Sequence, residues 1–331
     1  MNLIGHQAQA EAFLAAWRSG QLPHAWLLTG PQGLGKRRFA DAAIGHVLAS
    51  AAGPPVDDME LEVAGTHPIC RLIEAGSHMD LRVLEREVRE RTGDLAAGIT
   101  IDQVRALHPL LQSTPALSPW RAVIVDSIDD LARPAANALL KSLEEPPPQT
   151  LFLLISHAPG RLLPTIRSRC RIMRFHALPY DEVVRVIAAQ VPEASAEEQR
   201  ALVRMADGVP GKAARYAGLD IAGLMTSIAG IDGKGEGAVA AQAALAASLS
   251  GKAAQARYEA FLELVPTHIA GRARQVSGAA LARTLVLWEK ARDLAASAVP
   301  LSLDPQSVVF ELAGMLAALD LQPEPEPQLY G

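Results

Sequence analysis

The sequence predicts an α/β domain built on a parallel sheet, followed by a region made only of helices. Between residues 1 and 176, short continuous apolar runs alternate with segments of helical periodicity, which is the pattern of strands buried on both faces of a parallel sheet. Beyond this segment, only helical periodicity remains. Hydrophobic residues make up 49% of the 331 residues and aromatic residues only 4%, a composition typical of a helix-rich protein with an ample core.

Five short apolar runs are predicted to form the strands of this sheet. They are residues 25–29, 80–84, 121–125, 151–155 and 171–175. Helices are expected between them. A capping box at residues 100–103 opens a helix that is expected to continue to about Ser113, and Pro134 opens another, which the prolines from Pro146 onward stop. In the helical region, residues 195–198 have the pattern of a further capping box.

The segment between the first predicted strand and the helix that follows has the pattern of a phosphate-binding loop. Gly30, Gly35 and Lys36 fit G-x-x-x-x-G-K, with a further glycine at Gly33. The glycines let backbone N–H groups turn towards phosphate oxygens, and the lysine adds a positive charge beside the β- and γ-phosphates. Strand, loop and helix in this order are the context that the motif requires, so we favour a nucleotide site over a glycine-rich turn with an incidental lysine.

This predicted site departs from a hydrolytic one at two positions. The pattern calls for Ser or Thr after the lysine to hold Mg²⁺, but the residue is Arg37, and a guanidinium cannot ligate a cation. Asp126, at the end of the third predicted strand, has the position of a magnesium-binding acid, although a plain strand-end turn would also explain it. The next residue is Ser127, which cannot activate a water molecule as a glutamate would. We therefore expect a loop that could still bind a nucleotide such as ATP, without hydrolysing it, and that lacks one half of the catalytic metal site.

Other polar residues follow the third and fourth predicted strands. Ser156, at the end of the fourth, is assigned to the nucleotide-binding set. Asp129 and Asp130 follow Ser127 after a short interval and are expected to point elsewhere. No residue of the candidate site is predicted to ligate a metal.

Charge and cysteine content restrict the class of protein. The formal net charge of −5 excludes a globally basic nucleic-acid binder, so that any contact with DNA must be local or shared with partners. Cys70 and Cys170 give no disulfide framework and favour a reducing compartment. The first ten residues lack the pattern of a signal peptide, and the alanine-rich residues 237–250 are too few to span a membrane. We expect a cytoplasmic protein.

Four further tracts resemble the bacterial clamp-loader ATPases of the AAA+ class. They are residues 136–147 (ANALLKSLEEPP), 168–170 (SRC), 22–31 (LPHAWLLTGP) and 4–6 (IGH). The resemblance covers about the first 175 residues. It implies a P-loop AAA+ domain over residues 1–176, a helical lid over 177–218 and an all-α collar over 219–321. Residues 322–331 are polar and proline-rich, and their composition predicts a disordered tail.

Within this family the chain resembles a stator more than a motor subunit of the gamma or tau type. Motor subunits carry the metal-binding hydroxyl, the catalytic glutamate and an arginine in the lid, where this chain has Arg37, Ser127 and Gly211. The resemblance implies that Arg169, in the Ser-Arg-Cys tract, is an arginine finger that acts in trans on the ATP of a neighbouring subunit. The alternative is a self-sufficient ATPase motor. A DNA-binding scaffold is a third possibility, which the acidic balance disfavours.

The same resemblance implies a set of partners. A clamp-loader stator of the DNA polymerase III holoenzyme joins gamma or tau motor subunits and a delta subunit in an open pentameric ring. Through that hetero-oligomer it meets the sliding clamp and primed DNA, and no membrane is involved.

The family's usual zinc module is incomplete in this sequence. That module has four cysteines between the first helix and the second strand, and only Cys70 occurs there. His67 and His78 are near in sequence, but one thiolate and two imidazoles leave the fourth ligand unfilled. We therefore expect no bound zinc.

Overall fold

The structure is a computed structural model that describes residues 3–89 and 93–319. It divides into two compact units, Met1–Glu182 and Val183–Gly331, and each is described by itself. The predicted disordered tail, residues 322–331, lies outside the described residues. Among the residues that are described, no helix is both long and apolar enough to cross a membrane.

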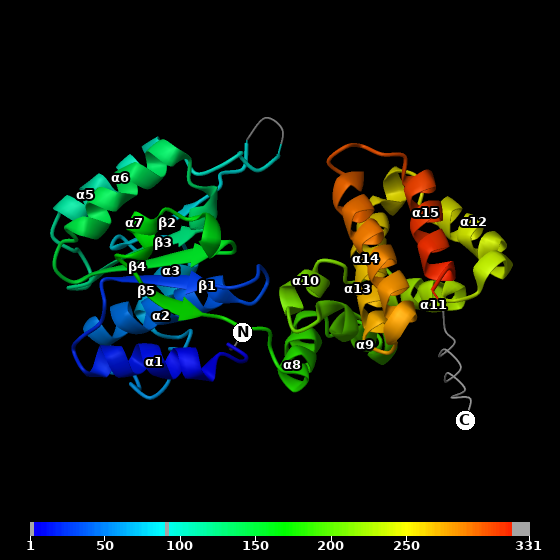
Figure 1. Ribbon diagram of the computed structural model, residues 1–331. Helices are drawn as coiled ribbons and strands as arrows, with labels where there is room; N and C mark the ends of the chain where they lie inside the picture. Colours follow the sequence, from blue (N-terminus) through cyan, green and yellow to red (C-terminus); the bar gives the residue numbers. More distant parts are fainter. Residues whose placement is uncertain (1–2, 90–92, 320–331) are drawn as a thin grey trace, which may run out of the picture. The chain divides into compact units, whose positions relative to one another are not determined.

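The first unit contains the predicted parallel sheet (Figure 1). Its strands are β1 (Ala25–Thr29), β2 (Leu81–Glu85), β3 (Arg121–Asp126), β4 (Thr150–Ser156) and β5 (Arg171–Arg174). They lie side by side in the order β2-β3-β4-β1-β5, and every neighbouring pair is parallel. The predicted α/β class and its parallel sheet are confirmed, with strand ends displaced by no more than one residue.

Helices cover both faces of the sheet, with α5 and α6 on one side and α1 and α2 on the other in Figure 1. The helices of this unit are α1 (Gln7–Arg18), α2 (Lys36–Ala51), α3 (Pro68–Glu74), α4 (Ile101–Arg105), α5 (His108–Gln112), α6 (Arg133–Glu144) and α7 (Pro164–Arg167). Because both faces are covered, β1 and β4 are buried at every position, which explains their continuous apolar sequences.

Each face of the sheet has its own core. On one face, Leu27, Val123 and Phe152 from three strands belong to one cluster with Leu139 and Leu143 of α6. On the other face the aromatic rings of α1, α2 and β1 meet. The ring centroid of Phe13 lies 5.5 Å from that of Trp26 and 6.2 Å from that of Phe39. These contacts fix α2, and with it the loop that precedes α2, against the sheet.

The prediction of a single helix from the capping box to Ser113 is wrong, because the helix that begins there is shorter. The capping box at Thr100 and Gln103 is present, but the segment forms two short helices, α4 and α5. The reason is Pro109, the second residue of α5, which has no N–H to continue the hydrogen bonds of α4.

The second unit is helical throughout its described part. Its helices are α8 (Tyr180–Gln190), which begins in the first unit, α9 (Ala196–Ala206), α10 (Pro210–Ala214), α11 (Ile221–Ile231), α12 (Val239–Ser248), α13 (Gln255–Ala273), α14 (Gly278–Ala298) and α15 (Pro305–Ala317). α13 packs along α14, and α12 packs against α15. The predicted boundary between lid and collar at residue 218 stays a prediction.

The predicted capping box at residues 195–198 is only half formed. Ser195 Oγ accepts the N–H of Glu198 at 3.1 Å, as expected. The Glu198 carboxylate, however, accepts the N–H groups of Ile221 and Ala222, at 2.9 and 3.0 Å. It therefore caps the N-terminus of α11 and joins α9 to α11 within the second unit.

The parallel register brings the functional strand ends to one edge of the sheet. Thr29 at the end of β1 pairs with Ser156 at the end of β4, and Asp126 at the end of β3 pairs with Ile155. The loop after β1, the acid after β3 and the hydroxyl of Ser156 therefore share the carboxyl edge, where ligands of open α/β sheets bind.

Candidate functional site

The glycine loop leads directly into the N-terminus of α2. Gly35 is the residue before α2 and has φ of 83°, a left-handed conformation that favours glycine. Gly30 has φ of 146°, and a Cβ there would lie 2.4 Å from the carbonyl oxygen of Phe175. Gly33 also has a positive φ, 90°. The sixteen-residue helix α2 turns its free N–H groups and the positive end of its dipole towards this loop, an arrangement that suits an anion.

Lys36 is the first residue of α2 and lies beneath the loop with 3% of its surface exposed. Its Nζ donates to the carbonyl oxygens of Gly30 and Pro31, each at 2.6 Å. Burial lowers the pKa of Lys36 to about 8, although Asp126 and Asp129 act in the opposite direction. An ammonium has three N–H donors, so one remains for an oxygen atom of a phosphate.

Arg37 forms ion pairs with three carboxylates. Its Nε lies 3.0 Å from Asp41 Oδ1, and its Nη1 lies 2.9 Å from Glu85 Oε2 and 3.4 Å from Asp126 Oδ2. Burial by itself lowers the pKa of Arg37, but Asp41 and Glu85 outweigh it and raise the pKa above its usual value. The guanidinium therefore stays charged and neutralises the acid that would otherwise hold Mg²⁺. This side-chain set does not fit a divalent cation.

Asp129 turns towards the candidate site, so the expectation that it points elsewhere is wrong. Its carboxylate accepts the hydroxyl of Ser156 at 2.9 Å and also the N–H of His157. The reason is the short 3₁₀ helix Ile128–Asp130, which reverses the chain after β3. The Asp130 carboxylate pairs with Arg86 at 3.4 Å and also accepts the hydroxyl of Ser127 at 3.4 Å. Asp129 is thus a polar residue of this edge that sequence reasoning set aside.

Arg169 lies in the turn between α7 and β5. Its Nη2 is 2.6 Å from Glu144 Oε1 at the end of α6, and its Nη1 donates to the carbonyl oxygen of Thr165 at 2.9 Å. The side chains of Arg169 and Glu144 are 33% and 46% exposed. The next residue, Cys170, is a free thiol whose pKa burial raises to about 12, so it is not a nucleophile. Arg169 is therefore held in a partly exposed ion pair with Glu144.

In the predicted remnant of a zinc module, ring nitrogens of His67 and His78 contact backbone atoms. His67 Nδ1 accepts the N–H of Ile69 at 3.2 Å, and its Nε2 lies 3.2 Å from the carbonyl oxygen of Pro54. His78 Nδ1 accepts the N–H of Asp80 at 3.2 Å. Within residues 3–89 and 93–319, no three His, Cys, Asp or Glu side chains gather as a metal would require. The absence of zinc stays a prediction.

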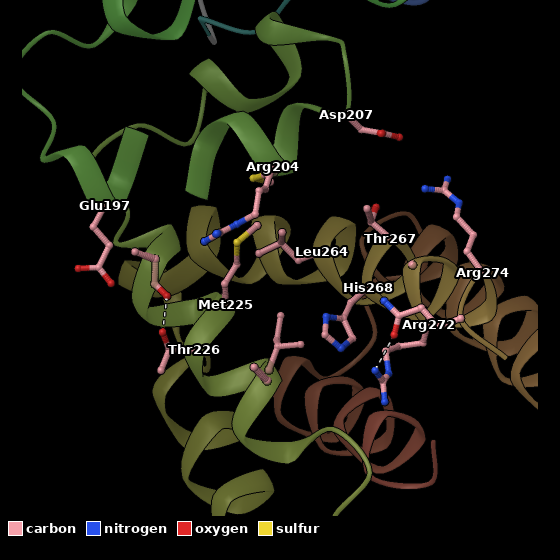
Figure 2. Close-up of a pocket in the computed structure, with 16 residues that line it drawn as sticks. Glu197, Arg204, Asp207, Met225, Thr226, Leu264, Thr267, His268, Arg272 and Arg274 are labelled. Atoms are coloured by element: carbon pink, nitrogen blue, oxygen red, sulfur yellow. Dashed lines mark hydrogen bonds between the residues drawn. The ribbon is translucent and has the colours of Figure 1, made fainter. Parts of the chain in front are cut away.

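A cavity of about 550 Å³ lies within the second unit, among α9, α11 and α13 (Figure 2). Figure 2 shows Arg204 and Met225 among the side chains that line it. Asp232 holds the lining residues His268 and Arg272, at 2.7 and 3.2 Å. The lining residues come from three helices and from the residues that directly follow two of them, between positions 197 and 275, which is why no sequence motif pointed to them. None of the residues predicted for the candidate site lines this cavity.

Comparison of the chain with known proteins gives a consistent result. The family model described as "DNA polymerase III, delta subunit" matches residues 5–179, which is more than half of the chain. The chain is 38% identical over 202 residues to the DNA polymerase III subunit delta' of Pseudomonas aeruginosa, a match that covers 60% of this chain and 57% of that protein.

Two further relatives follow. The chain is 31% identical over 203 residues to the subunit delta' of Escherichia coli, covering 61% of this chain and 57% of the relative. It is 28% identical over 181 residues to the subunit gamma of Buchnera aphidicola, covering 55% of this chain and 46% of the relative. The chain thus spans about half the length of the curated relatives it matches.

Proposed function

Because this chain belongs to the DNA polymerase III delta-subunit family, we propose that it is a delta-prime-type stator of the clamp loader, which helps to load the sliding clamp onto primed DNA. One observation carries this proposal. The guanidinium of Arg37 is paired with Asp126, so the acid at the end of β3 has its counter-charge from the chain itself. A motor subunit needs that acid for Mg²⁺.

The loss of hydrolysis follows from the chemistry of phosphoryl transfer. That reaction depends on positioning and on neutralising negative charge rather than on covalent steps. In this chain Arg37 replaces the hydroxyl ligand, and Ser127 stands where a base would activate water. The isolated chain therefore holds ATP at the loop without turning it over. Gly30, Gly33, Gly35 and Lys36 supply the phosphate contacts.

Arg169 serves a neighbouring subunit in this proposal. Its pair with Glu144 is half exposed, and such pairs contribute only about 0–1 kcal/mol, so the guanidinium can exchange its carboxylate for a phosphate at little cost. A planar guanidinium can contact two phosphate oxygens at once. It would stabilise charge on the γ-phosphoryl group of ATP bound to the adjacent motor subunit.

The partners follow from the family. We place gamma or tau motor subunits and a delta subunit beside this chain, with the sliding clamp and primed DNA reached through the complex in the cytoplasm. The helical second unit supplies the assembly surface. With a formal net charge of −5, the chain is not suited to hold DNA by itself.

Co-purification tests this assignment. The chain is co-expressed with gamma and delta subunits, and the mixture is separated by size-exclusion chromatography. We expect the three proteins to elute as one complex that loads a clamp onto primed DNA, with activity lost when this chain is omitted. If the chain elutes alone and its omission leaves clamp loading unchanged, the assignment is wrong. Steady ATP turnover by the isolated chain, lost in Lys36→Ala, would instead favour a motor.

A further inference from the structure

Arg37 occupies the sequence position at which a phosphate-binding loop has its metal ligand. Instead of a hydroxyl, that position carries a guanidinium surrounded by carboxylates from three elements. Asp41 lies one turn further along α2, Glu85 ends β2, and Asp126 ends β3. The three contacts measure 3.0, 2.9 and 3.4 Å.

The carboxylates differ in how much they need this cation. The side chains of Asp41 and Glu85 are 42% and 59% exposed, so water solvates much of their charge. The side chain of Asp126 is only 24% exposed. A carboxylate with little solvent beside a polyphosphate requires a counter-charge, and Mg²⁺ is the usual one. In this chain the counter-charge of Asp126 is a side chain of the protein itself, the guanidinium of Arg37.

We propose that Arg37 takes the place of the divalent cation, so that this loop binds the phosphates of ATP in metal-free form. The inference rests on the ATP binding contained in the proposed function. Two cations then have separate tasks. Lys36 and the N-terminal amides of α2 face the phosphates, and Arg37 neutralises Asp126. A magnesium ion bound at Asp126 Oδ2 would have to displace the guanidinium, which would leave Asp41 and Glu85 without their cation.

Binding of ATP to the full chain, measured by isothermal titration calorimetry in EDTA and in excess Mg²⁺, tests this directly. We expect ATP to bind in EDTA at least as tightly as in excess Mg²⁺, because Mg²⁺ in solution competes with the protein for the phosphates. A dissociation constant in EDTA that is about tenfold weaker than in Mg²⁺ would overturn the inference. Absence of binding under both conditions would overturn it as well, yet would leave the clamp-loader assignment intact, because co-purification with the other subunits tests that assignment independently.

A substitution at Arg37 sharpens the test. Arg37→Thr restores the hydroxyl ligand and removes the internal cation, so affinity for ATP in EDTA should fall by about tenfold, with excess Mg²⁺ restoring it. The matched control is Arg38→Thr, which removes the same charge one residue further along α2 and should bind ATP in EDTA as tightly as the unaltered chain does. Metal-insensitive binding by Arg37→Thr would contradict the inference. If that variant fails to fold, the comparison of EDTA with Mg²⁺ on the unaltered chain still decides.

Discussion

Two arginines of the first unit, Arg37 and Arg169, illustrate two different uses of the same side chain. Arg37 contacts three carboxylates from three elements, one of them the largely buried Asp126. Arg169 contacts one half-exposed carboxylate, Glu144, and one backbone carbonyl. The first guanidinium has three carboxylate partners, whereas the second has one, which we propose it exchanges for a phosphate. The two guanidinium side chains are equally exposed, at 34% and 33%, so the number of partner carboxylates and the burial of Asp126 are what distinguish the two arginines.

Reversing the charge of Arg37 should give the largest effect on stability. Arg37→Glu would place a fourth carboxylate beside Asp41, Glu85 and Asp126, so repulsion replaces three attractive pairs. We expect the free energy of unfolding to fall by about 1–3 kcal/mol, because solvent screens the pairs with Asp41 and Glu85 and most of the loss comes from Asp126. Urea denaturation followed by circular dichroism measures the change. A loss below about 0.5 kcal/mol would mean that Arg37 is an ordinary surface residue.

The pKa of Lys36 predicts an effect of intermediate size, on ATP affinity. Burial lowers this pKa to about 8, and a bound phosphate raises it because an anion favours the ammonium form. The complex therefore holds more protons than the free protein above pH 8, so affinity falls as the pH rises, by up to about tenfold per unit. Calorimetry at pH 8.5 in buffers of different ionisation enthalpy should detect proton uptake. Proton release would contradict the prediction.

Removing the partner of Arg169 should give the smallest effect on stability. Glu144→Gln abolishes an exposed ion pair, which costs about 0–1 kcal/mol. The same urea experiment as for Arg37→Glu serves for a direct comparison. A loss as large as that of the Arg37 variant would remove the distinction between the two arginines, since Arg169 would then be a structural residue.

The sequence predicted the features that depend on local pattern. Continuous apolar runs marked the strands, because both faces of a parallel sheet are covered, and the glycines before Lys36 marked the loop. Features that depend on distant partners were missed. Glu85 is 48 residues from Arg37, and no spacing rule links the two. The direction of Asp129 depends on the 3₁₀ turn after β3, and the cavity in the second unit is assembled from three separate helices.

The central claim, that this chain acts on the ATP of a neighbour, is tested most directly at Arg169. DNA- and clamp-stimulated ATP hydrolysis is measured in the reconstituted complex with Arg169→Ala, Arg169→Lys and, as control, Arg167→Ala. Arg167 ends α7, is exposed and has no ion pair within the described residues.

All three variants should assemble normally. Removing a dominant arginine finger costs about 10³–10⁵ in catalysis at its own site, and several sites contribute to the bulk rate, so we expect Arg169→Ala to lower stimulated hydrolysis by about threefold or more, with little rescue by lysine. Arg167→Ala should leave the rate unchanged. Equal, small effects of the substitutions at Arg169 and Arg167 would contradict the account.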